Sequence, residues 1–213
     1  MAQATKTENE WDRPGVPGTE IAAVKEPTRT EAQWGNPGAL GLAAFGLNTI
    51  LLQIHNLGWI DSTMPLVYGI IWGGIIQIIA GIIDGRRGDT FGLTAFCSYG
   101  AFWIGLALTF VFQWTGLVLA DSDGLAWTMI IWGIFTFFMM IGTLKMTFMH
   151  FFVFASLVVL FGLLAAAFFG AISPKVAGVE GIFCGGAAVY GAAAVIINGK
   201  FGRTVLPLGK MLK

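Results

Sequence analysis

The residues best suited to chemistry lie in one apolar segment, residues 38–57. On a helical wheel of about 100° per residue, its polar side chains gather on an arc roughly 160° wide with Phe45 at the centre. They are Asn48, Thr49, Gln53, His55 and Asn56. Unsatisfied polar groups cost several kcal/mol inside a bilayer, so we predict that this arc lines a hydrophilic path. Hydrogen bonding to neighbouring helices is the alternative.

A second candidate precedes this segment, at Asn36-Pro37-Gly38. Asn is a preferred N-cap and Pro fits the first helical turn. The free N–H groups of that turn predict an anion site that needs no charged side chain, although the same residues suit an ordinary helix start. Two further polar features are Gln77, isolated in a later apolar segment, and a patch formed by Thr94 with Ser98 and Tyr99.

Asp, Glu, Lys and Arg are missing from the six apolar segments as we draw them, and Asp84 and Lys145 stand only at segment ends. This argues against a cation or redox pump and suggests that any transported proton travels on the substrate or through water. The sequence has no phosphate-binding loop, metal-ligand cluster or nucleophile–base pair, so we expect neither an enzyme nor a cofactor or metal. Cys97 and Cys184 lie in apolar stretches and are expected to be unpaired.

Composition defines the fold class. The chain has 213 residues, of which 56% are hydrophobic and 11% charged, against about 25% charged in soluble domains. Its formal net charge of zero gives no reason to expect nucleic acid. A spanning helix takes about 20 residues, so we predict an all-α integral membrane protein whose six transmembrane helices lie at about 38–57, 64–83, 93–119, 127–143, 151–171 and 181–198.

The distribution of basic residues predicts the orientation. With six spans, every Lys and Arg except Lys175 falls on one side. The positive-inside rule then places both termini in the cytoplasm. We expect a disordered polar cytoplasmic tail at 1–33, a six-helix transport domain at 34–199 and a cytoplasmic C-terminal tail at 200–213. The sequence Ile-Ile-Trp-Gly occurs at 70–73 and again at 130–133, which hints at repeated helix hairpins.

Several motifs resemble one known family. Asn36-Pro37-Gly38-Ala39-Leu40-Gly41-Leu42 is similar to the signature of the acetate uptake transporter family, which includes the succinate–acetate permeases, with Gly38 and Ala39 departing from it. Matching stretches follow in order to about residue 208. They are 49–52 with His55 and Asn56, 88–96 leading to 98–100, 142–145 and 201–207.

The resemblance implies a cyclic homo-hexamer in the plasma membrane, with a narrow path for small monocarboxylates, and sometimes succinate, in each protomer. It places a hydrophobic constriction at Phe45, Tyr99 and Leu157, and a residue that influences substrate size at Ala188. Proton symport and a passive anion channel both remain open. A membrane scaffold or sensor that transports nothing is the rival from another class. An ammonium or water channel is disfavoured, because paired pore histidines and duplicated Asn-Pro-Ala turns are missing.

Overall fold

The computed structural model describes residues 34–117 and 121–211. In these ranges six helices are long and apolar enough to cross a membrane, which confirms the all-helical prediction. The first, third, fifth and sixth are single α-helices: α1 (Gly38–Asn56), α4 (Thr90–Trp114), α6 (Phe148–Phe168) and α7 (Pro174–Phe201). The fourth is α5 (Ser122–Gly142), which continues as the 3₁₀ turn η3 (Thr143–Lys145).

The second span contains a change of helix type that we did not predict. It begins as α2 (Thr63–Ile70), continues as the π-helix η2 (Ile71–Ile76) and ends as α3 (Gln77–Arg86). A π-helical turn widens the helix locally and is common at functional sites. Here the wide turn carries Gly74, where a Cβ would come within 2.5 Å of Ile104 on α4. The missing side chain therefore lets this span pack closely on α4.

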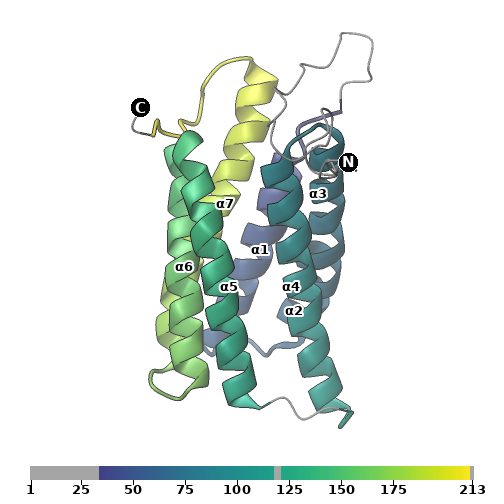
Figure 1. The fold of residues 1–213 in the computed structure, drawn as a ribbon, viewed down its shortest axis with the longest axis vertical. Helices are drawn as coiled ribbons and strands as arrows, with labels where there is room; N and C mark the ends of the chain where they lie inside the picture. Colours follow the sequence, from purple (N-terminus) through teal and green to yellow (C-terminus); the bar gives the residue numbers. More distant parts are fainter. Residues whose placement is uncertain (1–33, 118–120, 212–213) are drawn as a thin grey trace, which may run out of the picture. The chain divides into compact units, whose positions relative to one another are not determined.

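The closest pair of helices is α1 with α7. A Cβ on Gly46 would lie 2.7 Å from the carbonyl oxygen of Gly185, and a Cβ on Gly185 would lie 2.8 Å from that of Gly46. The two backbones are therefore in direct contact, as small residues permit in membrane helix pairs. Figure 1 shows α1 near the middle of the helical bundle, with α5 to α7 on one side and α2 to α4 on the other.

Polar caps begin the later helices. The side chain of Asp89 accepts from the backbone N–H of Gly92, that of Asp121 from Gly124, and that of Thr147 from His150. Such caps satisfy N–H groups that a helix start leaves open. At α1 our prediction is shifted by one residue: Pro37 is the N-cap, and Asn36 lies before it and accepts the N–H of Gly38 at 2.9 Å.

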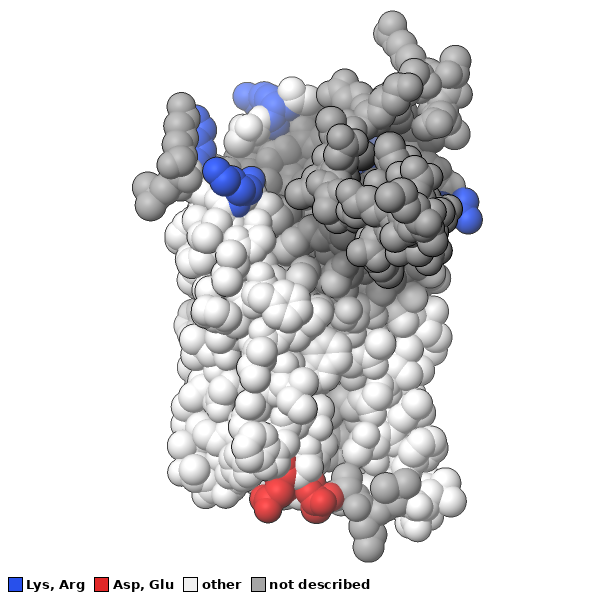
Figure 2. Space-filling model, viewed as in Figure 1, with Lys and Arg blue, Asp and Glu red and all other residues white. Residues whose placement is uncertain are grey.

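On the face drawn in Figure 2, Lys and Arg lie at one end of the helices and acidic residues at the other. What we call the basic end holds the start of α1 and the end of α7, and carries Arg86, Arg87, Lys145, Lys200, Arg203 and Lys210. The opposite, acidic end carries Asp61, Asp121 and Asp123. The backbone N–H of Thr63 donates to Asp61 at 2.8 Å and holds the pKa of this carboxyl below its usual value, so it is ionised at neutral pH.

The segment after α7 folds back on the basic end. The amide of Asn198 donates to the carbonyl of Leu206, while its oxygen accepts the N–H groups of Val205 and Leu206. The hydroxyl of Tyr190 donates to the carbonyl of Pro207 at 2.7 Å. The backbone of Leu208 then accepts from Met149 in the first turn of α6. The predicted N-terminal tail, 1–33, lies outside the described residues.

One sequence-based statement needs correction. The last span begins at Pro174, not near residue 181, so Glu180 lies inside a membrane helix and that apolar segment does contain a carboxyl. One of its oxygens accepts from Ser156 at 2.6 Å, while the other is buried without a partner among the described residues. The two Ile-Ile-Trp-Gly stretches also differ in structure, because residues 71–73 belong to η2 whereas residues 130–133 are regular α-helix.

The contact between α1 and α7 predicts a difference between neighbouring glycines. Gly185→Val should lower the midpoint of thermal unfolding in detergent by several degrees, because overpacking costs about 1–3 kcal/mol and the obstacle is backbone. Gly186→Val is the matched control, since a Cβ there meets nothing within 4 Å. Equal midpoints for the two variants would contradict this account of the helix pair.

Candidate functional site

Two cavities open into the helical bundle, one near each end. The acidic-end cavity has a volume of about 430 Å³. It contains His55 and Asn56 from α1 together with Ser62 and Gln113, and its other lining is apolar. Nδ1 of His55 lies 3.1 Å from the carbonyl oxygen of Ile60, and it donates to this oxygen in the tautomer that carries the proton on Nδ1. The remaining lining residues are Leu52, Leu66, Leu106, Phe110, Trp114, Met129, Leu164 and Phe168.

The basic-end cavity also measures about 430 Å³. Asn36, Gly38 and Leu42 contribute the start of α1 to its wall. Its charged and titratable members are Asp84, Arg87, Asp89 and His150, and its other lining residues are Phe91, Gly92, Ala95, Phe96, Met146, Phe154, Val195 and Leu208. The two cavities share no lining residue.

Three helices line both cavities, and on each of them one predicted constriction residue lies in the gap. On α1, Phe45 falls between Leu42 in the basic-end cavity and Leu52 in the acidic-end cavity. On α4, Tyr99 falls between Phe96 and Leu106. On α6, Leu157 falls between Phe154 and Leu164. The three side chains therefore occupy the level that separates the cavities.

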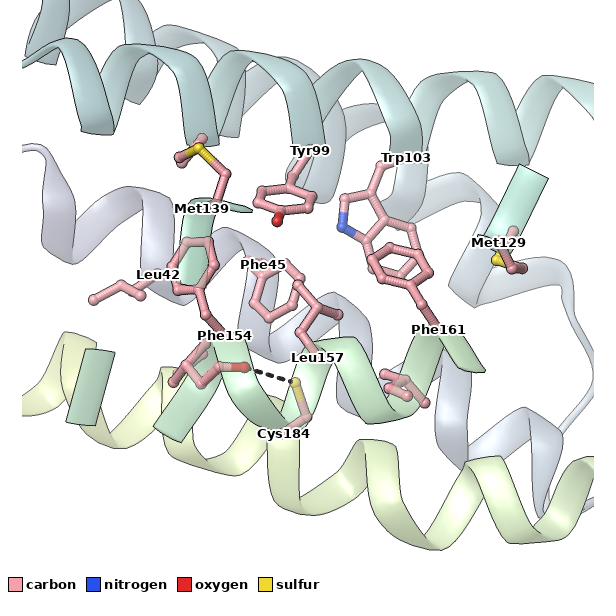
Figure 3. Close-up of a cluster of buried hydrophobic side chains, with 14 of the residues drawn as sticks. Leu42, Phe45, Tyr99, Trp103, Met129, Met139, Phe154, Leu157, Phe161 and Cys184 are labelled. Carbon is pink, nitrogen blue, oxygen red and sulfur yellow. Dashed lines mark hydrogen bonds between the residues drawn. The ribbon is translucent and has the colours of Figure 1, made fainter. Parts of the chain in front are cut away.

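These side chains meet in one buried cluster, drawn in Figure 3. Phe45, Tyr99 and Leu157 are 7%, 3% and 4% exposed, and the rings of Phe45 and Tyr99 are 6.0 Å apart. The Tyr99 hydroxyl donates to the Thr136 hydroxyl on α5 at 2.9 Å, and Thr136 donates onward to the carbonyl of Trp132. Tyr99 is thus held in place by a bond to a residue that the sequence did not single out.

The predicted polar arc of α1 divides between different neighbours. Asn56 donates to Gln53 at 2.8 Å, and Gln53 packs against Gly181 of α7. Thr49 donates to the carbonyl of Phe45 within its own helix. Both Thr49 and Gln53 are buried and line neither cavity, whereas His55 and Asn56 do line one.

Asn48 forms part of an unusual group on the other side of the arc. It is 1% exposed, and neither atom of its amide has a hydrogen-bond partner among the described residues. A Cβ on Gly73 would lie 3.0 Å from this amide and equally close to Trp103. The indole nitrogen of Trp103 and Oε1 of Gln77 are likewise buried and unpaired within residues 34–117 and 121–211. Buried polar groups of this kind need a hydrogen-bond partner, which a water molecule or a transported ligand can supply.

The remaining predicted residues lie apart from the two cavities. Ala188 is fully buried and belongs to the same cluster as Phe45, Tyr99 and Leu157. Leu40 and Thr94 are half-buried and line neither cavity. The structure therefore brings Ala188 to the constriction and leaves Leu40 and Thr94 outside it.

The basic-end cavity differs from the uncharged anion site that we predicted at Asn36. Asp84 is only 4% exposed, and its nearest cationic group is Arg87 with Nη1 at 3.7 Å from Oδ1. Two carboxyl groups and one guanidinium thus face the start of α1. An anion at the helix start is therefore also repelled by the two carboxyl groups and attracted by the guanidinium.

The sequence contained a signal for the path on α6 that we did not use. Residues spaced alternately by four and three recur along one side of this helix and reach both cavities and the constriction. They are His150, Phe154, Leu157, Phe161, Leu164 and Phe168. The pattern is hard to see in the sequence because nearly all the remaining residues of α6 are apolar as well.

Six membrane-length helices around two cavities and a constriction define a polytopic membrane protein of the transporter or channel class. The sequence profile of the GPR1/FUN34/yaaH family matches residues 20–211, and the chain belongs to this family.

Individual relatives agree with this assignment. The chain is 45% identical over 176 residues to the succinate-acetate/proton symporter SatP of Escherichia coli K12, covering 80% of this chain and 93% of that one. The solved structure of the bacterial acetate channel SatP superposes with a TM-score of 0.80 at 45% identity, covering 83% of this chain and all of that one. The ammonia transport outward protein 2 of Saccharomyces cerevisiae is 35% identical over 169 residues, which are 74% of this chain and 60% of that protein.

The bond between Tyr99 and Thr136 predicts a stability difference between two threonines of α5. Thr136→Val should lower the free energy of unfolding by about 1–3 kcal/mol, because the buried Tyr99 hydroxyl loses its partner. Thr128→Val is the control: Thr128 makes a similar bond to its own helix but is exposed. Thermal unfolding in detergent measures both, and adding Tyr99→Phe to Thr136→Val should cost little more. A further full loss would contradict the pairing.

Proposed function

We propose that the chain transports acetate and related short carboxylates, with succinate as a larger substrate, through one path in each protomer. The path runs from the acidic-end cavity, past Phe45, Tyr99 and Leu157, to the basic-end cavity. The observation that carries the proposal is that these side chains lie on three helices exactly between the stretches that line the two cavities. The names of the SatP relatives supply the substrate class.

The charge distribution and the family of the protein support a proposal for its membrane, its orientation and its assembly. We place the protein in the plasma membrane with the basic end in the cytoplasm, because Lys and Arg, except Lys175, collect at that end of the described chain. We further propose a cyclic homo-hexamer with a path in every protomer, and three stacked helix hairpins as the plan of each protomer. Under this plan the acidic-end cavity faces outward.

Passage of a carboxylate requires replacement of its water shell. Outside the constriction, His55 and Asn56 offer polar contacts in the acidic-end cavity. Near the constriction, the unpaired amide of Asn48, the indole N–H of Trp103 and the amide of Gln77 provide donors and acceptors. Phe45, Tyr99 and Leu157 then exclude ions that keep a full hydration shell.

Flux measurements test the proposal. Purified protein in liposomes should exchange labelled acetate faster than protein-free vesicles do, and formate, succinate and ammonium are compared alongside. An imposed pH gradient that drives acetate accumulation supports symport, whereas flux that neither drives nor responds to the gradient supports a channel. If no carboxylate moved at any pH, the protein would be a scaffold or sensor. Transport of ammonium alone would instead favour the function named for the yeast relative.

The constriction predicts a change in substrate size preference. Leu157→Ala should raise the ratio of succinate flux to acetate flux by about tenfold, because removal of a bulky wall relieves the larger substrate more than the smaller one. Val159→Ala is the control, since Val159 lies two residues away on α6 and is 52% exposed. An unchanged ratio in Leu157→Ala, with intact protein, would show that the constriction lies elsewhere.

A further inference from the structure

The basic-end cavity contains a histidine whose ring is already fixed. Nδ1 of His150 lies 2.7 Å from the hydroxyl of Thr147, the N-cap of α6. The Thr147 hydroxyl can donate to a neutral ring or accept from a protonated one. This contact therefore serves both protonation states and leaves Nε2 as the nitrogen that is available to the cavity.

The other charged groups around this cavity come from one side. Asp84 and Arg87 lie at the end of α3, and Asp89 stands just before α4. The lining contributed by α1, by α7 and by the C-terminal segment carries no charge; it consists of Asn36, Gly38, Leu42, Val195 and Leu208. Lys145 is the last residue of η3, and Lys210 forms an isolated β-bridge with Thr147. Neither lysine lines the cavity.

This arrangement makes the charge of the cavity depend on His150. When both carboxyls are ionised and the imidazole is neutral, two negative groups face one guanidinium, and a carboxylate substrate is repelled. Protonation of the imidazole balances the charge. Histidine is the side chain whose ordinary pKa, about 6.5, permits this change near neutral pH.

We propose that His150 is the proton-binding residue of the basic-end cavity and that its protonated form admits the carboxylate there. The inference rests on the proposed function, and it adds a place where a proton and a carboxylate meet on the cytoplasmic side of the constriction. His150 acts by contact with the substrate or by its charge within the same cavity. No other residue of the described chain combines a titratable imidazole with this cavity.

Acetate exchange at equal pH inside and outside the vesicles tests the proposal without regard to the orientation of the protein. Between pH 6 and 8 the wild-type rate, corrected for protein-free vesicles, should fall by about 25-fold, as the protonated fraction of an imidazole with a pKa of about 6.5 does. His150→Gln removes the titration and should give a low rate with little slope. His150→Lys fixes a positive charge, since the pKa of lysine is about 10.4, and should keep a high rate at pH 8.

Two further variants separate His150 from the other titratable groups. His55→Gln changes the histidine at the acidic end, and Asp84→Asn changes the buried carboxyl of the same cavity. His55→Gln should retain the wild-type slope with pH after its rate is normalised, whereas Asp84→Asn leaves one carboxyl against one guanidinium and should raise the rate at pH 8. Gel filtration and helical content identify misfolded variants, which would lower the rates of both His150 variants alike rather than in opposite directions.

The outcomes are distinct. The assignment of His150 would be overturned if the exchange rate of His150→Gln depended on pH as steeply as that of the wild type, whether or not Asp84→Asn lost this dependence. A wild-type protein that exchanges no acetate at any pH would instead overturn the proposed function.

Discussion

The backbone contact between α1 and α7 is the constraint on which the path depends. Because Gly46 and Gly185 let the two helices touch, α1 has one side fully occupied by α7. Phe45, about 100° from Gly46 around the helix, then faces Tyr99 of α4 in the cluster that also contains Leu157 of α6. The position of the constriction follows from this rotation, since three bulky groups from three helices meet only when α1 is held at this angle.

Polar groups inside the helices show how the protein meets the demands of a membrane. Thr49 and Gln53 bond within their own helix and line neither cavity, so they add little to a conducting path. Asn48, Gln77 and Trp103 keep unpaired atoms near the wide turn η2. A site that transports polar molecules through an apolar layer needs such groups, because each one can replace a water molecule that the substrate gives up. Glu180, which accepts from Ser156, lines neither cavity.

Much of the fold could be predicted from sequence because hydrophobic length and the positions of basic residues are strong signals. The six spans appeared within a few residues of their observed limits, except that the last begins before Glu180. The π-helix at Ile71–Ile76 was not predicted. For the path, the wheel of α1 centred on Phe45, but the partition of its polar side chains depends on neighbours that a single helix does not reveal. Thr136 and His150 were missed for the same reason: each gains its meaning from a contact across helices or across a cavity.

The central claim is that carboxylates cross at the level of Phe45, Tyr99 and Leu157, and thiol modification tests it most directly. In a chain with Cys97 and Cys184 replaced by alanine, Leu157→Cys would be treated with a charged methanethiosulfonate while labelled acetate exchange is followed. We expect acetate to slow the labelling, and complete labelling, verified by mass spectrometry, to stop exchange. The same treatment of Val159→Cys should leave exchange intact. Fully labelled Leu157→Cys protein that exchanges acetate at its original rate would contradict the account.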